Sequence, residues 1–403
     1  MLDKFRDHAT ADASFSWGHV FARLAAEMPA AQALRTELHR HPDLSGAEAR
    51  TLDTLLAHLP EAADRTRLPG HAGLIRIGPP GPAVAIRAEM DALPIVENTG
   101  VEWASTNGAM HACGHDVHMA AFVAVARAID SLPEPPVPLV GLLQPREETS
   151  PSGALEFVNS TVLHDHRIAA IIGAHVQPAL KSTAVACSSG VVNAASDEFF
   201  VTIHGSPAHG AYPHNSRDPL LAASNFVVTC QQIVSRNSDP IDSAVVSIGS
   251  IRAGTAPNAI PDEATVSGMV RTMSAGQRTM IQKRIREVAD GIALAHGCTA
   301  EVTIYPGEPP LQNNTALARA AARILQDTGN EITEFRSYGA DDFAFYAEVA
   351  PSLMIFVGTP ESRGHGLHAS GYLPDDGALW RVACSMLAGY LAAAQSLTDT
   401  ETV

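Results

Sequence analysis

Short apolar runs separated by polar turns dominate the first half of the chain. The alanine-rich stretch 117–130 is apolar on most faces, as expected of a helix packed against a sheet. The runs around it are typical of buried strands; they are AGLIRIG (72–78), PAVAIRA (82–88), VPLVGLLQ (137–144) and IAAIIGA (168–174). Upstream, apolar positions at helical spacing in 29–58 flank a turn-like HPDLSG. The alternation of strands and helices predicts an α/β layer.

From about residue 195 the pattern changes to strands in which apolar and polar positions alternate, such as 198–205 and 243–251. Helical stretches at 217–236 and 275–297 lie among them, and a last strand covers 299–305. Strand, helix, two strands, helix and strand form a split βαβ, ferredoxin-like pattern. After it, LMIFVG (353–358) and a helix near 376–396 resume the α/β pattern.

The sequence therefore predicts a mixed-sheet α/β domain with a smaller α+β domain inserted into it. The larger domain would comprise 1–194 and 305–403, and the inserted domain 195–304. A chain of 403 residues with 46% hydrophobic content agrees with two domains, since single cores stop growing near ~250 to 300 residues.

Composition narrows the partners and the compartment. The chain has 43 acidic and 27 basic residues, a formal charge of −16, which repels nucleic-acid phosphates and anionic lipid surfaces. No apolar run approaches the ~20 residues of a membrane helix, and the first twenty residues lack a secretory-signal pattern. Five scattered cysteines favour a reducing cytoplasm over a disulfide framework.

Polar side chains follow three of the predicted buried strands. Glu89 and Asp91 follow the second run, Glu147 and Glu148 the third, and His175 the fourth. In open α/β sheets ligands bind at such strand ends. The stretch HACGHDVH (111–118) opens the next helix, which would bring further ligands beside the same edge.

Cys113 and His115, with a carboxylate and His175, offer mixed sulfur, nitrogen and oxygen ligands. That set suits zinc and is acceptable to manganese, cobalt or nickel. If Glu148 binds metal, Glu147 is left to take a proton from water, which is a hydrolase design. Each feature also has a purely structural interpretation, such as a solvated Glu147–Glu148 loop or a capping turn with Asp116 as the helix N-cap.

Two further histidines, His118 and His39, are not assigned as metal ligands. His118 lies on a helix face similar to that of His115, and hydrogen bonding or packing is favoured over ligation for it. His39, in LHRHPD, is assigned to a helix end without a role.

Several motifs together resemble a known family. They occur in order and at matching spacing from about residue 34 to 390: RAEMDALP (87–94), MHACGHDVH (110–118), LLQPREE (142–148), GAHVQP (173–178), HGSPAHGAYPH (204–214), GTAPNAIP (254–261), GMVRT (268–272), GADDFAFY (339–346) and GLHAS (366–370). They are similar to those of the co-catalytic metallohydrolases that include the aminoacylases. The closest branch contains hippurate hydrolase and the plant auxin-conjugate amidohydrolases.

The resemblance implies a catalytic domain, an inserted lid domain and two divalent ions, with zinc as the first choice and manganese, cobalt or nickel as alternatives. It implies Glu147 as general base and Asp91 as a supporting aspartate. The ligands that it implies are Cys113, His115, Glu148, His175 and His368.

The resemblance also implies roles in the lid. His209 would stabilise the oxyanion in a neighbouring subunit of a homodimer that forms through the lid, while Asn258 and Arg271 would hold the substrate. From the residues alone, a surface salt bridge is the preferred interpretation of Arg271, and the resemblance makes it a clamp for the carboxylate of an amino acid.

The sequence departs from the family pattern at several positions. Glu89 stands where aspartate is common, Arg146 where a small residue is usual, and Asp341 where glutamate is frequent, while TSPSGA replaces a glycine-rich run. Because the implied ligands and base are intact, these departures bear on substrate range rather than on hydrolysis.

The resulting hypothesis is a metal-dependent amidohydrolase that cleaves N-acyl amino acids. A dipeptidase or carboxypeptidase on the same scaffold, a catalytically silent ligand-binding relative and a zinc-storage protein are the alternatives.

Overall fold

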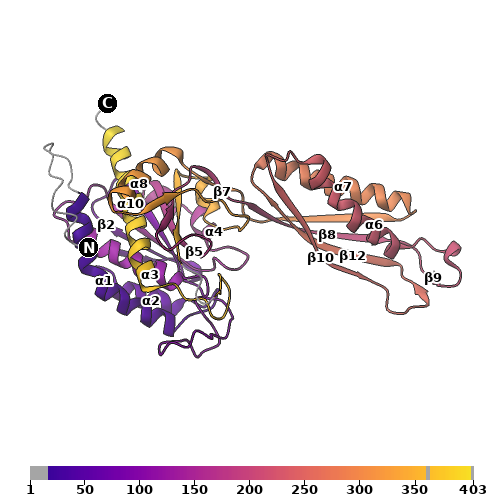
Figure 1. The fold of residues 1–403 in the computed structure, drawn as a ribbon, viewed down its shortest axis with the longest axis horizontal. Helices are drawn as coiled ribbons and strands as arrows, with labels where there is room; N and C mark the ends of the chain where they lie inside the picture. The colour runs from indigo at the N-terminus through magenta and orange to yellow at the C-terminus, as the bar shows by residue number, and fades with distance from the viewer. Residues whose placement is uncertain (1–16, 360–363, 401–403) are drawn as a thin grey trace. The chain divides into compact units, whose positions relative to one another are not determined.

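The computed structural model describes residues 17–359 and 364–400 (Figure 1). The amino-terminal residues in which no signal pattern was found lie outside this range, apart from 17–20. The chain divides into two compact units, each with its own hydrophobic core. The first unit comprises Met1–Gly190, Asn313–Phe335 and Phe345–Val403, and the second comprises Val191–Gln312 and Arg336–Ala344. The second unit thus extends beyond 195–304 on both sides.

The first unit contains an eight-stranded mixed sheet in the order β1-β2-β4-β3-β5-β16-β6-β15. Its strands are β1 (Asp64–Arg67), β2 (Gly73–Ile77), β3 (Ala83–Glu89), β4 (Leu139–Gln144), β5 (Ile168–Gln177), β6 (Ala184–Ala186), β15 (Glu331–Thr333) and β16 (Ser352–Gly358). Strand β3 runs parallel to both β4 and β5, and β16 runs parallel to β5. The four apolar runs correspond to β2, β3, β4 and β5, so these predicted strands are confirmed.

Long helices pack on this sheet and on one another. They are α1 (Trp17–Arg40), α2 (Ala49–His58), α3 (His115–Asp130), α8 (Thr315–Asp327) and α10 (Asp376–Thr400). Helix α3 contacts α1, α10 and strand β3, and almost every one of its side chains is buried. Full burial explains why the sequence of α3 is apolar on most faces.

Shorter elements complete the chain outside the second sheet. They are η2 (Pro69–His71), α4 (Ala154–Val158), α5 (Val162–Asp165), α9 (Ala344–Ala347), β7 (Gly190–Asn193) and β14 (Leu311–Asn313).

Helix α10 contradicts the expectation that no segment of the chain has the length and apolar composition of a membrane helix. Its segment Asp376–Thr398 is long and apolar enough, by length and composition, to cross a membrane. However, 83% of the most apolar window of this segment is buried inside the protein. The apolar composition of α10 therefore matches its place in the core, where it packs on β5, β16, α3 and α8.

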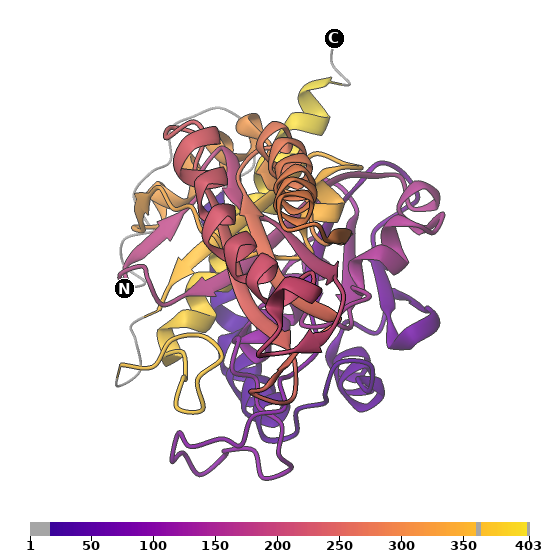
Figure 2. The ribbon, with the colours of Figure 1, turned by 90° about the vertical axis from the view of Figure 1, so that its right-hand side faces the viewer.

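The second unit follows the predicted split βαβ order. Its elements are β8 (Ala195–His204), β9 (Ala208–His209), η3 (Pro213–Asn215), α6 (Pro219–Gln232), η4 (Ile233–Asn237), β10 (Ala244–Ala253), β11 (Ala259–Ile260), β12 (Glu263–Thr272), α7 (Ala275–Ala295) and β13 (Thr299–Pro306). The four long strands form an antiparallel sheet in the order β10-β12-β8-β13. Helices α6 and α7 lie side by side on one face of it (Figures 1 and 2). The predicted fold class is confirmed.

Candidate metal centre

Parallel pairing brings the chemistry-bearing residues of three strands to one edge of the large sheet. Glu89 ends β3, and Glu147 and Glu148 follow the neighbouring strand β4. His175 lies near the end of β5, inside the strand rather than beyond it. The chain passes from β3 through α3 to β4, and later returns to β5 on the other side of β3. This reversal of direction is where ligands bind in open α/β sheets.

Helix α3 begins at His115, and the residue before it determines how closely the helix approaches β5. Gly114 has a left-handed φ of 84° and is the N-cap. A Cβ at this position would lie 2.5 Å from Val176 Cγ2, so only glycine fits. Asp116, the N-cap in the structural interpretation of the sequence, is instead in the first turn, so that interpretation is wrong.

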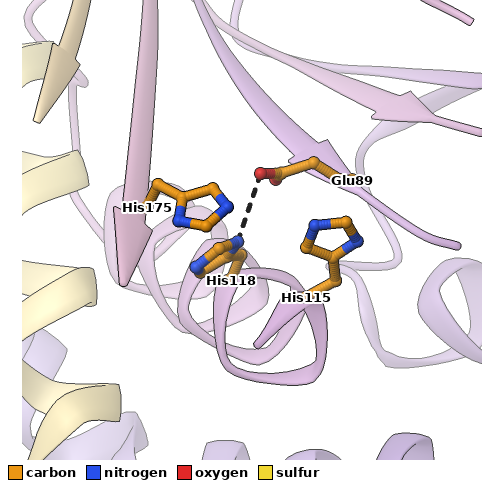
Figure 3. Close-up of side chains that lie close together, drawn as sticks. All are labelled: Glu89, His115, His118 and His175. Carbon is orange, nitrogen blue, oxygen red and sulfur yellow. Dashed lines mark hydrogen bonds and ion pairs between the residues drawn. The ribbon is translucent and has the colours of Figure 1, made fainter. Parts of the chain in front are cut away.

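Two groups of potential ligand atoms converge at the sheet edge. One consists of Glu89, His115, His118 and His175, all buried, whose ligand atoms lie within 4.8 Å of one another (Figure 3). The second consists of Cys113, Glu148 and His368, and His115 also lies within this distance of Glu147 and Glu148. The structure therefore brings together all seven residues of the first unit to which the sequence analysis assigned a role, since Asp91 contacts His115.

Hydrogen bonding leaves one ring nitrogen of His115 without a protein partner and available to a metal ion. Its Nδ1 lies 2.9 Å from the backbone carbonyl oxygen of Asp91, which can only accept a hydrogen bond. The N–H at Nδ1 therefore donates to this carbonyl, and Nε2 is buried without a hydrogen-bond partner. Burial opposes protonation of the ring, but Asp91, Glu89 and Glu148 outweigh it and raise the pKa of His115 to about 10, so a bound cation would take the place of the Nε2 proton. Asp91 Oδ1 is likewise buried without a hydrogen-bond partner. Orphaned buried atoms of these types fit a bound cation.

Asp91 is held as a carboxylate. Its Oδ2 accepts hydrogen bonds from Ser45 Oγ at 2.6 Å and from the backbone N–H of Glu148 at 3.0 Å. Burial opposes ionisation, but the contacts with His115, Ser45 and Glu148 outweigh it and lower the pKa of Asp91 to about 2. Asp91 thus ties the loop after β3 to the loop after β4.

Cys113 also fits a cation. Burial raises the pKa of its thiol well above the usual value, and the carboxylates of Glu148 and Glu147 raise it further. The Cys113 Sγ lies 3.4 Å from His175 Nε2. A divalent ion would reverse the local balance of charge and favour the thiolate. The mixed sulfur, nitrogen and oxygen donors are those that zinc and its neighbours in the first transition row accept.

His368 approaches Glu148 from a distant part of the chain. Its Nε2 lies 3.1 Å from Glu148 Oε1, and its side chain is 52% exposed. His368 has a left-handed φ of 63°, and its N–H donates to the carbonyl of Ala112. Arg146, directly before Glu147, has a φ of 50°. Non-glycine residues in this region are strained and concentrate at functional sites.

Arg146 does not add a cation beside Glu147. Its guanidinium forms an ion pair with Glu156, and its backbone N–H donates to Glu48 Oε1 at 2.9 Å. Arg146 therefore holds the loop from β4 to α4, and the departure from the family pattern at this position does not alter the charge at the sheet edge.

The three predicted site residues of the second unit lie at opposite ends of it. His209 in β9 pairs with Ala259 in β11, next to Asn258, at the tip beyond the His204–Glu263 end of the sheet (Figure 1). Arg271 pairs with Ser196 at the other end. Eight residues of β12 separate the two ends, roughly 27 Å at strand spacing. One copy of this unit therefore cannot bring His209 and Arg271 to the same small substrate.

Sequence analysis missed two contributions to the site. Glu89 received no role, yet it belongs to the first cluster of potential ligands. His39 also received no role, although it is buried and its ring nitrogens contact Asp116 Oδ2 at 3.1 Å and Glu97 Oε1 at 3.0 Å. The place of Glu89 at the end of a buried strand is visible in the sequence and indicates a ligand. Nothing in the sequence around His39 indicates its contacts, because Glu97 and Asp116 are distant along the chain.

The stability of the first unit should depend on pH through His39. Burial would lower the pKa of His39, but Asp116 and Glu97 outweigh it and raise the pKa from 6.5 to about 9. The folded protein therefore retains this proton at pH values where the unfolded chain loses it. The stabilisation is complete below pH 6.5 and is lost as the pH rises through about 9.

We expect His39 to contribute a slope of about −1.4 kcal/mol per pH unit to the free energy of unfolding in that window. Denaturant unfolding of wild type and His39→Gln between pH 6 and 10 measures the difference between their slopes, which cancels the groups that both proteins share. Equal slopes would contradict the assignment.

Comparison with known proteins agrees with this geometry. Peptidase family M20/M25/M40 matches residues 85–399. The N-acetylcysteine deacetylase of Bacillus subtilis is 36% identical over 337 residues, covering 81% of this chain and 87% of the relative. The N-acetyldiaminopimelate deacetylase of Bacillus velezensis is 33% identical over 372 residues, covering 89% and 97%.

Among solved structures, the YXEP protein of Bacillus subtilis, a dinuclear metal-binding peptidase of the M20 family, superposes with a TM-score of 0.81. It is 30% identical, and the match covers 93% of this chain and 99% of that protein. The resemblance drawn from the motifs is thus confirmed. The chain belongs to peptidase family M20/M25/M40 and is a metal-dependent amidohydrolase.

Proposed function

We propose that this protein hydrolyses the amide bond of N-acyl amino acids, releasing a carboxylate and a free amino acid. The observation that carries the proposal is the position of Glu147. Its carboxylate lies beside His115 and Glu148. Glu148 also pairs with His368 in the ligand cluster, which leaves Glu147 as the glutamate that can take a proton from water. The relatives whose names specify a substrate act on N-acetylated amino acids.

Two divalent ions are proposed as cofactors, zinc first, with manganese, cobalt or nickel as alternatives. His115 and His175 would hold one ion and Cys113, Glu148 and His368 the other. Bound ions supply Lewis acidity to the scissile carbonyl and to water. The dinuclear centre of the YXEP protein supports this number.

The protein's own residues would then move the proton. Glu147 accepts it from the attacking water and delivers it to the nitrogen of the leaving amino acid. The carboxylate of Glu147 is only 10% exposed, and Oε2 lies 3.9 Å from His115 Nε2. Asp91 supports the reaction indirectly, since its backbone carbonyl fixes the His115 tautomer and its carboxylate holds the backbone of Glu148.

Arg271 is proposed to bind the carboxylate of the amino-acid product. Its Nη1 is buried and has no hydrogen-bond partner, which favours an anionic ligand over the surface salt bridge that the sequence also allowed. Asn258 and His209 would act on a substrate at the other end of the lid, with His209 donating to the oxyanion.

A homodimer formed through the second unit would let one chain supply His209 to another. Strand β10, ten residues long, lies at an edge of the sheet in the described part of the chain, and such edges attract a further strand. Exposed apolar side chains lie on helix α6, which contacts β10, and just before β10 itself; Leu221 is 51%, Val228 73% and Ile241 94% exposed. A cytoplasmic location is proposed because the five cysteines are all buried free thiols.

Activity assays on purified protein test the function. We expect a chelator to abolish hydrolysis of acetyl, benzoyl or longer acyl amino acids, and added zinc, manganese, cobalt or nickel to restore it. Faster turnover of dipeptides would favour a dipeptidase. Fewer than one bound ion per chain after metal supplementation, without turnover of any substrate, would favour a silent ligand-binding relative. Metal storage predicts ions without hydrolysis.

A further inference from the structure

The large sheet forks at the centre of the metal site. Strand β3 pairs with β5 only as far as Ile86 and Ile172, whereas β3 stays paired with β4 to Glu89, and β5 stays paired with β16 to Gln177. Beyond Ile86 the two central strands therefore separate. The backbone N–H groups of β5 that face β3 in this stretch need other acceptors, whereas those that face β16 stay paired.

His118 of α3 fills the fork. The N–H of Val176 in β5 donates to His118 Nε2 at 3.0 Å, and His118 Nδ1 lies 3.2 Å from Glu89 Oε1 at the end of β3 (Figure 3). A backbone N–H can only donate, so Nε2 must be the unprotonated nitrogen. The proton is then on Nδ1, which donates to the Glu89 carboxylate. Both ring nitrogens are occupied.

Glu89 is itself held in place by Arg87, two residues earlier on β3. Its Oε1 lies 2.5 Å from Arg87 Nη1, and Arg87 Nε donates to Gln144 Oε1 at 3.2 Å. All of these side chains are fully buried. Burial opposes ionisation of Glu89, but Arg87 and His118 hold its pKa well below the usual value. Glu89 therefore presents an acceptor to His118 whose own position is set by a buried ion pair.

The peptide groups on either side of Val176 link His118 to His175. His118 holds the N–H of Val176, while His175 Nδ1 donates to the carbonyl of Val176 at 2.7 Å. That bond directs His175 Nε2 toward Cys113 Sγ. A shift of the Val176 backbone would therefore move the ring of a proposed ligand.

We propose that His118 is a positioning residue and not a metal ligand: as a neutral imidazole held by Glu89, it fixes the Val176 backbone across the fork and thereby orients His175. The inference rests on the proposed metal site. Partners of metal-binding histidines typically change metal affinity by ~10 to 100-fold when they are removed.

Two substitutions separate the two hydrogen bonds of His118. The amide oxygen of glutamine reaches the place of Nε2, so His118→Gln retains an acceptor for Val176 N–H and loses the bond to Glu89. The amide nitrogen of asparagine takes the place of Nδ1, so His118→Asn retains the Glu89 bond and leaves Val176 N–H without an acceptor. His58, half-buried on α2, provides the matched control pair His58→Gln and His58→Asn.

The test is a Co²⁺ titration of metal-free protein, followed by the cobalt–thiolate absorption of Cys113, with kcat and KM measured afterwards. We expect His118→Gln to bind Co²⁺ within about threefold of wild type and His118→Asn to bind it ~10 to 100-fold more weakly. Equal weakening in both variants would identify His118 as a ligand, and unchanged affinity in both would make it merely structural; either result overturns the inference. Failure of wild type to bind Co²⁺ would instead refute the proposed function.

Discussion

Glu147→Gln should lower kcat by about 10² to 10⁴-fold and leave the metal content unchanged. The amide has nearly the shape of the carboxylate but cannot accept the proton from water. Because Glu147 lies beside His115 and Glu148 without being one of the proposed ligands, the ions should stay. Steady-state kinetics and metal analysis on the same preparation measure both quantities.

Two control variants sharpen this result. Glu148→Gln should lose bound metal together with activity, because Glu148 belongs to the cluster with Cys113 and His368. Glu156→Gln, which changes the partner of Arg146 outside that cluster, should keep more than a tenth of the activity. If Glu147→Gln also lost metal, Glu147 would be a ligand, and the proposed division between the two glutamates would be wrong.

His209→Ala should lower kcat by about 10² to 10³-fold, the usual cost of losing one donor to an oxyanion. His209 is exposed at the tip of the second unit, far along β12 from Arg271. If a partner subunit receives this side chain, mixing His209→Ala chains with Glu147→Gln chains should restore turnover. Mixed dimers then contain one site with both an intact base and an intact histidine.

Equal mixing of the two inactive proteins, after subunit exchange, should recover up to about a quarter of the wild-type rate, because half of the dimers are mixed and each has one complete site. His214→Ala is the control, since His214 lies near Tyr212 in the same exposed loop and has no proposed role. The absence of any recovery between proteins shown to exchange would argue against shared sites.

The fold could be predicted because burial leaves a direct mark on sequence. Strands β3 and β4 are covered on both faces and are therefore nearly continuous apolar runs, interrupted in β3 by the buried Arg87. Strand β8, covered on one face by helices, alternates instead. Strands β6 and β15, each three residues long, are too short to show either pattern. Helix α10 was recognised as a helix, but its capacity to span a membrane by composition was missed, because a few polar residues interrupt the run.

The convergence of the site could be predicted only in part. Ligands bind at the carboxyl ends of parallel strands, and this rule predicted that Glu89, Asp91 and the Glu147–Glu148 pair lie together. The prediction holds because β3 and β4 are parallel neighbours, so their carboxyl ends lie at the same edge of the sheet. The approach of His368 to Glu148 depends on a loop conformation with a left-handed φ, which no local pattern reveals. The fork between β3 and β5 was also beyond prediction, because both strands continue past it, each paired with its other neighbour, and a local pattern does not show which neighbour a strand keeps.

The buried contact of α1 with α3 determines where the polypeptide can be shortened. Arg35 and His39 of α1 both contact the carboxylate of Asp116, the residue after His115, and Arg35 also donates to the carbonyl of Pro374. A fragment that began at residue 85, where the family match starts, would lack both cations. It would leave an anion in an apolar interior one position from a proposed ligand. Helix α1 is therefore an integral part of the hydrolase, although it lies before the residues that the family match covers.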